Sequence, residues 1–347
     1  METLWFCIVA VMMAVYVVLD GFDLGTGVLH LFVARSDTER RTVLQSIGPV
    51  WDGNEVWLLA AGGTLFLAFP KLYASGFSGF YLPLMMVLWL LILRAISIEF
   101  RSHLKNPVWR PLWDVVFSGS SLFLAMFLGT ALGNVVRGVP LGEDGFFFTP
   151  LWTSFRTGGT ELGILDWYTV TVGVTSFLAL THHGAMWMIL KTEGAIRDRA
   201  KTAAGWTWPL LLFLVALVTV LTFWIQPHVR ERTLGNPIAL LFPLLALAAL
   251  FGSRLYTSRG RELKAFLASC FFLIMLLVSV VFGLYPVVLP AAADPELSLT
   301  VHNAAGPPYA LRVALWWWIP GMSLVLLYTT TMYRSMAGKV VLDEEGY

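Results

Sequence analysis

Long apolar stretches dominate this sequence of 347 residues. A helix needs about 20 apolar residues to cross the roughly 30 Å hydrocarbon core of a bilayer. Nine stretches approach or exceed that length, at about 4–33, 50–70, 76–99, 112–135, 164–190, 204–225, 236–254, 263–289 and 311–333. The sequence therefore predicts an all-α, polytopic membrane protein with about nine transmembrane helices. We expect residues 1–347 to form a single integral membrane domain.

The composition argues against the main classes of soluble protein. Only 13% of the residues are charged and 57% are hydrophobic, whereas soluble domains carry roughly 25% charged residues. The net charge of +1 gives no field that would attract nucleic acid. Cys7 and Cys270 both lie in apolar runs, which speaks against a disulfide framework or a thiolate metal site. We therefore expect no nucleic-acid partner and no metal site in this chain.

The basic residues predict the orientation of the chain in the membrane, because Lys and Arg concentrate in cytoplasmic loops. Of the 23 Lys and Arg residues, 17 fall at one set of alternate connections and 6 at the other. This bias predicts an amino terminus outside the cell and a carboxyl terminus in the cytoplasm. The chain starts Met-Glu-Thr without a basic segment. The first stretch is therefore predicted to be a retained helix rather than a cleaved signal peptide.

Acidic residues inside the first apolar stretches are the main functional candidates, because a charge in the bilayer costs several kcal/mol and usually faces a partner or a cavity. Asp20 and Asp23 are three residues apart, so both carboxylates lie on one face of a helix. Asp52 and Glu55 repeat this spacing at the start of the second stretch. The alternative interpretations are structural: a helix-packing seam for the first pair and a favourable interaction with the helix dipole for the second.

Arg94 and Glu99 lie near the predicted cytoplasmic end of the third stretch. Arg94 follows an apolar run and should need a carboxylate partner, unless it extends to the membrane interface. Asp20, Asp23 and Asp52 are the candidate partners, and the sequence does not choose among them. Six residues form this acid-rich track: Asp20, Asp23, Asp52, Glu55, Arg94 and Glu99. Such a track could take up protons from the cytoplasm or bind a transported cation.

The histidines and the remaining acid of the early helices are weaker candidates. His182 and His183 are adjacent, so on a helix they point about 100° apart and cannot share one site. His183 could ligate a haem, but a hydrogen-bonded core histidine is the expected state. Asp114 stands just inside the fourth stretch and is expected at the membrane interface.

Six segments carry more specific motifs: LDGFDLGTG at 19–27, IGPVWDGNEVW at 47–57, AGGTLFLAFP at 61–70, YASGFSGFY at 73–81, LRAISIEFRS at 93–102 and SLTVHNA at 298–304. Together these segments resemble subunit II of cytochrome bd-type quinol oxidases, a family with a cyanide-insensitive branch. The resemblance covers nearly the whole chain, although the middle part matches in hydropathy more than in residue identity.

The resemblance implies a membrane enzyme complex in the bacterial plasma membrane. Such a complex oxidises quinol, reduces dioxygen to water and generates a proton gradient. A haem-bearing subunit I would carry haems b and d, or b only, while this chain would stabilise subunit I and carry no haem. The resemblance also implies two four-helix bundles plus one peripheral helix. It allows for small accessory membrane subunits, a bound quinone and membrane lipid as further partners.

The resemblance also assigns roles to individual residues. Asp52 would be the acid of a proton path from the cytoplasm, and Asp23, Arg94 and Glu99 would belong to the same polar region. Trp57 would stand beside a lateral apolar route for dioxygen. At the position of Glu55 some relatives have glutamine, which argues against an obligatory relay there.

A stand-alone ion-coupled transporter is the alternative function. It would use Asp20, Asp23 and Arg94 as its coupling site. The sequence shows neither an inverted repeat nor a pair of broken helices in its favour.

Overall fold

The computed structural model describes residues 1–158 and 162–341, and helices make up most of this part. The helices are α1 (Glu2–Val33), α2 (Asp37–Ile47), α3 (Trp51–Ala68), α4 (Pro70–Gly79), α5 (Tyr81–Phe100), α6 (Trp109–Arg137), α7 (Trp167–Lys191), α8 (Gly194–Ile225), α9 (Pro227–Leu234), α10 (Pro237–Ser258), α11 (Glu262–Leu284) and α12 (Pro308–Ser335). An antiparallel pair of short strands, β1 (Val287–Leu289) and β2 (Leu299–Thr300), encloses the 3₁₀ turn η1 (Pro295–Leu297).

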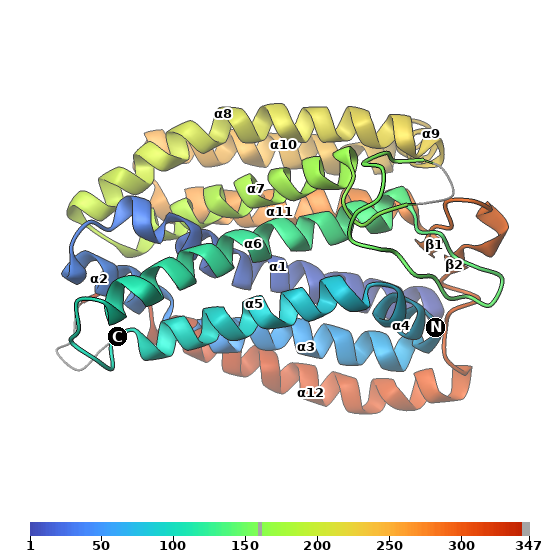
Figure 1. The fold of residues 1–347 in the computed structure, drawn as a ribbon, viewed down its shortest axis with the longest axis horizontal. Coiled ribbons are helices and arrows are strands. Elements are labelled where there is room, and N and C mark those ends of the chain that lie inside the picture. The colour runs from blue at the N-terminus through green and yellow to red at the C-terminus, as the bar shows by residue number, and fades with distance from the viewer. Residues whose placement is uncertain (159–161, 342–347) are drawn as a thin grey trace.

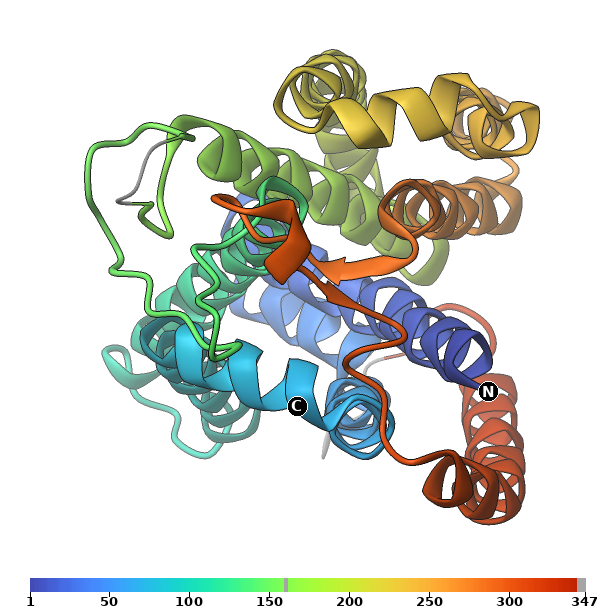
Figure 2. The ribbon, with the colours of Figure 1, turned by 90° about the vertical axis from the view of Figure 1, so that its right-hand side faces the viewer.

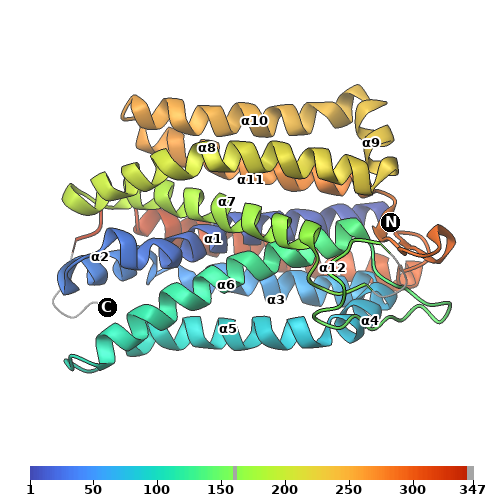
Figure 3. The ribbon, with the colours of Figure 1, turned by 45° about the horizontal axis from the view of Figure 1, so that its top comes forward.

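Nine helices in the described ranges have 18 residues or more, and they run side by side along the molecule (Figures 1 and 3). Seven of them are long and apolar enough to cross a membrane: α1, α5, α6, α8, α10, α11 and α12. The other two, α3 and α7, carry polar residues such as Asp52 and His182. The all-α, multi-pass membrane class is thus confirmed. The count of nine spans and the division into two four-helix bundles stay predictions, and residues 159–161 and 342–347 of the expected domain lie outside the described residues.

Three predicted stretches differ in their bounds from the helices of the structure. The stretch 76–99 begins inside the short helix α4, and its main part is α5. The stretch 204–225 is the second part of α8, which already begins at Gly194. The stretch 263–289 continues too far, because α11 ends at Leu284, shortly before Pro286, and β1 follows. The helical conformation is unfavourable for the residue before a proline, because the proline ring clashes with it. This restriction explains where α11 ends.

α1 is the central helix of the fold and packs against α3, α6, α7 and α11. Its contact with α7 depends on small residues. A Cβ atom on Gly25 would lie 1.9 Å from the carbonyl oxygen of Leu180, and one on Gly184 would lie 2.3 Å from the carbonyl carbon of Gly25. The two backbones therefore touch directly, a close approach that small residues allow between membrane helices.

Different structural elements lie at the two ends of the molecule. The start of α1, helix α9 and the β1–β2 pair lie at one end, which faces the viewer in Figure 2. Helix α2, the connection from α5 to α6 and the end of α12 lie at the opposite end (Figure 1). This second end holds the polar network of Asp114 described below.

Candidate functional site

One buried polar cluster joins α1, α3, α5 and α12. We call it the Arg94 cluster and define it by Asp20, Asp23, Asn54, Glu55, Arg94 and Tyr333. The Arg94 side chain is completely buried, and its Nη2 atom lies 2.6 Å from Asp20 Oδ1 and 2.8 Å from Glu55 Oε2. Asp20 is thus the correct one of the three candidate partners. Glu55 is a second partner that the sequence did not indicate.

The other part of the Arg94 cluster is built on Asn54. Its Nδ2 atom donates to Asp23 Oδ2 at 2.7 Å and to the Leu19 carbonyl oxygen at 3.3 Å. The Tyr333 hydroxyl donates to Asn54 Oδ1 at 2.8 Å. One amide thus connects a carboxyl of α1 with a hydroxyl of α12. Sequence reasoning did not assign either residue: Asn54 gave only the signal of a polar residue between two acids, and Tyr333 stands 279 residues further along the chain.

Acids outnumber cations in this cluster. Asp20 and Asp23 are almost completely buried, and the Glu55 side chain is 20% exposed. Against these three carboxyls stands one guanidinium, that of Arg94. Several buried polar atoms also lack a hydrogen-bond partner within the described residues, among them Asp23 Oδ1 and Tyr16 Oη. Buried polar groups are normally paired, so the cluster has unused capacity to bind protons or polar molecules.

The structure separates the six acid-track residues into two groups. Asp20, Asp23, Glu55 and Arg94 belong to the Arg94 cluster, whereas Asp52 and Glu99 are exposed on the surface of the chain. Asp52 stands in the first turn of α3, one turn before Glu55. The positions of these residues do not test the roles that the sequence suggested for them.

Trp57 is 5% exposed and packs in a small apolar group. Its neighbours there are Met12, Tyr16 and Ala61, from α1 and α3. These contacts do not test the proposed dioxygen route, which stays a prediction.

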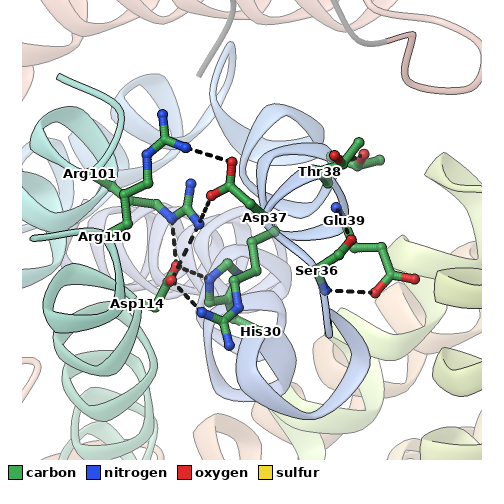
Figure 4. A network of polar contacts seen from close by, with 10 residues as sticks. His30, Ser36, Asp37, Thr38, Glu39, Arg101, Arg110 and Asp114 are labelled. Carbon is green, nitrogen blue, oxygen red and sulfur yellow. Dashed lines mark hydrogen bonds and ion pairs between the residues drawn. The ribbon is translucent and has the colours of Figure 1, made fainter. Parts of the chain in front are cut away.

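The second polar cluster lies at the α2 end of the molecule. We call it the Asp114 network and define it by His30, Asp37, Arg40, Arg101, Arg110 and Asp114 (Figure 4). The Asp114 carboxylate accepts hydrogen bonds from His30 at 2.6 Å, from Arg101 Nε at 2.6 Å and from Arg40 at 2.8 Å. Asp114 is completely buried. The position expected at the membrane interface is therefore the centre of a network that sequence reasoning missed.

Asp37 extends this network towards the surface. Its carboxylate accepts hydrogen bonds from Arg101 Nη2 at 2.9 Å and from Arg110 Nη1 at 2.6 Å (Figure 4). Asp37 is the first residue of α2, where an acid also complements the helix dipole. The network thus ties α2 to the ends of α5 and α6.

A capping box starts α2 and connects it to α8. Ser36 accepts a hydrogen bond from the Glu39 backbone N–H, and the Glu39 carboxylate accepts from the Ser36 N–H in return. Arg199 Nη2 of α8 donates to Glu39 Oε1 at 2.7 Å. The hydrogen bond from Arg199 lowers the pKa of Glu39 to about 2. The capping motif was a readable sign of α2, although this short charged helix was not predicted.

The two adjacent histidines are hydrogen-bonded core residues. His183 Nδ1 lies 2.8 Å from Ser269 Oγ, and its Nε2 lies 2.9 Å from the Val18 carbonyl oxygen. Both ring nitrogens of His182 are likewise within 3.1 Å of hydroxyl oxygens, those of Thr207 and Ser253. With both nitrogens engaged, neither ring fits the axial position of a haem. Within the described residues, no group of three or more His, Cys, Asp or Glu side chains could hold a metal ion.

The comparison with known families decides the assignment. Residues 1–336 match the model of the family "Cytochrome bd terminal oxidase subunit II". The chain belongs to this family. This subunit II is 32% identical to a probable cytochrome oxidase subunit 2 of Haemophilus influenzae, over 97% of the chain and 94% of the relative. It is 29% identical to the cytochrome bd-I ubiquinol oxidase subunit 2 of Escherichia coli, over 98% of the chain and 95% of the relative.

A solved structure supports the fold of this subunit II. The bd oxidase of Geobacillus thermodenitrificans contains a chain that matches with a TM-score of 0.76, covering 97% of this chain and 98% of that one. The sequence identity of this pair is 16%, so the match speaks for the fold alone.

Family membership confirms the central expectations from the sequence. This subunit II is a component of an oxidoreductase complex of electron transport, not a stand-alone transporter. A complex of this family contains haem cofactors and a partner subunit I. The roles of the individual residues do not follow from membership and are argued from the geometry below.

Proposed function

We propose that this subunit II stabilises a haem-bearing subunit I and supplies it with a proton path from the cytoplasm. The complex oxidises quinol and reduces dioxygen to water in the bacterial plasma membrane, and the proton gradient results from this reaction. The names of the Escherichia coli and Bacillus subtilis relatives, both ubiquinol oxidase subunits, support this activity. The haems, b and d or b only, belong to subunit I, because His182 and His183 of this chain are engaged elsewhere.

The proposed topology has nine spans, in two four-helix bundles plus one peripheral helix, and a single membrane domain. The amino terminus lies outside and the carboxyl terminus in the cytoplasm. Two observations support this topology. The start of α1 and the end of α12 lie at opposite ends of the molecule, as an odd number of spans requires (Figure 1). The basic Asp114 network lies at the end that the 17 to 6 distribution of Lys and Arg assigns to the cytoplasm.

The observation that carries the proton path is the charge balance of the Arg94 cluster. If all three carboxyls were ionised, two negative charges would stay uncompensated in a buried site. A buried charge without a partner costs several kcal/mol even after relaxation. A proton on one of the carboxyls removes part of that cost, so the cluster can hold a proton and release it to a neighbour. Carboxyl groups in membrane helices commonly form such relays.

The proposed order of the path follows burial. Asp52 is exposed and receives the proton, and Glu55 stands one turn deeper on α3 with its side chain 20% exposed. Arg94 holds Glu55 and the buried Asp20 at one guanidinium nitrogen. Arg94 keeps its own proton at all relevant pH values, so its role is to position the two carboxyls. Glu99 lies exposed at the end of α5 and is proposed to serve the start of the path.

The path is proposed to continue into subunit I across the outer face of α3. Asp52 shares this face with Val56 and Leu59, since positions four and seven residues apart align on a helix. Val56 is 49% exposed and Leu59 is 72% exposed in the isolated chain. An apolar face with one acid at its end suits a subunit interface that conducts protons. Trp57, on the same helix, is proposed to border the route of dioxygen.

A bound quinone is also proposed for this chain. A cavity of about 170 Å³ lies between α6, α7, α8 and α11, and most of its lining is apolar, including Val172, Val215 and Leu276. Apolar walls with few polar groups are typical of sites for such ligands. Small accessory subunits and lipid would cover other exposed apolar surfaces.

The test uses the intact complex with the substitution Asp52→Asn. We expect quinol-dependent oxygen consumption to fall by roughly tenfold or more, as removal of a proton-transfer group does. The haem content, read from the reduced-minus-oxidised spectrum, should stay normal. Asp198→Asn is the matched control, because Asp198 is an exposed acid at the same end of the molecule. Loss of haem from Asp52→Asn would instead show a purely assembly-related role, and unchanged turnover would exclude Asp52 from the path.

A further inference from the structure

A second pocket lies beside the Asp114 network, between the start of α2, the end of α5 and the start of α6. Its volume is about 360 Å³ and it is open to the surface. Five basic side chains line it: Arg35, Arg40, Arg101, Lys105 and Arg110. The acidic side chains in its lining are Asp37 and Asp114. The pocket therefore carries an excess of three positive charges, and the Arg94 cluster plays no part in it.

The ion pairs of the Asp114 network leave donors unused in this pocket. Asp114 already accepts hydrogen bonds from three side chains. Arg101 is only 1% exposed, yet its Nη1 atom has no hydrogen-bond partner within residues 1–158 and 162–341. The Nε atoms of Arg40 and Arg110 are likewise buried and unpaired within these residues. A buried guanidinium with a free donor favours an additional anion, and arginine matches phosphate oxygens especially well.

The surroundings of the pocket indicate where the anion comes from. The chain between α5 and α6 exposes Leu104 and Val108, and α6 exposes Leu112 next to them in sequence. Trp109 and Trp113 stack edge to face with their ring centres 5.5 Å apart. Tryptophan is enriched at the level of the lipid headgroups. The pocket thus lies at the end of two membrane helices, beside apolar side chains that lipid chains can cover.

We propose that this pocket binds the phosphate group of an anionic phospholipid from the cytoplasmic leaflet. The headgroup phosphate accepts hydrogen bonds from Arg101, Arg40 and Arg110, and the acyl chains lie along the exposed apolar side chains of the α5–α6 connection. Basic clusters at this level attract anionic lipids electrostatically. The proposal rests on the membrane fold, on the Asp114 network and, for the choice of leaflet, on the topology proposed above, and it is independent of the proton path.

The test measures the affinity of phosphatidylglycerol for the delipidated, intact oxidase complex by native mass spectrometry. The pocket variant combines Lys105→Gln and Arg110→Gln, the second of which removes a proposed phosphate donor, and both leave the ion pairs of Asp114 in place. The control variant combines Arg259→Gln and Lys264→Gln, which removes two exposed charges at the connection from α10 to α11. We expect the affinity to fall about tenfold in the pocket variant and to stay unchanged in the control. Equal affinities in all three complexes would overturn the proposal.

Two further arms identify the source of the phosphate. Inorganic phosphate at millimolar concentration should not displace phosphatidylglycerol, and a free anion that displaces it would make the pocket a site for soluble phosphate and overturn the lipid assignment. The last six residues of the sequence, 342–347, include Asp343, Glu344 and Glu345. A complex truncated after Val341 should bind the lipid as the full chain does. Binding seen only after truncation would show that the acidic end occupies the pocket, and would contradict the proposal.

Discussion

The Arg94 cluster and the Asp114 network both have members on α1 and at or just after the end of α5, but their charge balance is opposite. The Arg94 cluster sets three carboxyls against one guanidinium. The Asp114 network sets two carboxylates against three guanidiniums and one imidazole. A guanidinium does not lose its proton in proteins, whereas a carboxyl can. On the proposals above, excess acid suits a site that exchanges protons, whereas excess cation suits a fixed site that holds helices together and attracts anions.

The largest effect is expected from a substitution at the centre of the Asp114 network. Asp114→Asn should destabilise the complex by about 3–5 kcal/mol, because it removes the only buried carboxylate that pairs with Arg101 among the described residues and leaves the partly exposed Asp37 as its charged partner. Thermal unfolding and the yield of assembled complex measure this loss. Asp37→Asn is the control, since the Asp37 side chain is 46% exposed and its ion pairs should contribute about 1 kcal/mol or less. Similar losses from both variants would contradict a central role for Asp114.

The next largest effect is expected from a substitution in the Arg94 cluster, the site proposed to exchange protons. Asp20→Asn should lower quinol-dependent oxygen consumption by roughly two orders of magnitude, because one of the two carboxyls that Arg94 positions in the proposed path is gone. Assembly and haem content should stay near normal, since Arg94 keeps Glu55 as its charged partner. Ser118→Ala, a buried polar substitution on α6 outside both clusters, should leave turnover unchanged. A stable Asp20→Asn complex with full activity would remove Asp20 from the proton path.

A smaller effect concerns the part of the Arg94 cluster that sequence reasoning missed. Tyr333→Phe removes the hydroxyl that donates to Asn54, so the amide that pairs with Asp23 is held less firmly. We expect a loss of about 1 kcal/mol in stability and a fall in turnover clearly smaller than that of Asp20→Asn. Tyr328→Phe, on an exposed position of the same helix, is the control. A Tyr333→Phe complex as inactive as Asp20→Asn would mean that the hydroxyl itself carries protons.

The smallest effect depends on pH and tests the link between α2 and α8. The pKa of Glu39 is lowered from 4.5 to about 2, chiefly by its hydrogen bond with Arg199. A carboxyl whose pKa is lower in the folded state than in the unfolded state stabilises the fold at pH values above its unfolded pKa. This contribution is lost as the pH falls through the folded pKa of about 2. The stability difference between the native complex and Glu39→Gln should be about 1 kcal/mol or less near neutral pH. It should be reduced at pH 3 and by high salt.

Unfolding midpoints at pH 6 and pH 3 measure this difference. Glu193→Gln is the control, because Glu193 is exposed just before α8. A stability difference for Glu39→Gln that grows as the pH falls would contradict the assignment of this ion pair.

The sequence predicted the long helices and the acids of the Arg94 cluster for the same physical reason. A long apolar stretch is costly to expose to water, and a charge within such a stretch is costly without a partner. Both features can therefore be recognised locally in the sequence. The Asp114 network left no such sign, because its members come from four helices and each alone resembles an ordinary charge at a helix end. Tyr333 had no local sign at all, since only the packing of α12 brings it to Asn54. Helices α2, α4 and α9 were missed because they are too short to span a membrane.

The central claim is that the Arg94 cluster holds a proton that moves when the enzyme turns over. Infrared difference spectroscopy between the oxidised and reduced complex tests it most directly, because a protonated carboxyl has its own C=O stretching band. The account predicts a carboxyl band that shifts in D₂O and disappears in Asp20→Asn or Glu55→Gln, but persists in Asp198→Asn. A spectrum without such a band in the native complex, or a band that both cluster variants retain, would contradict the account.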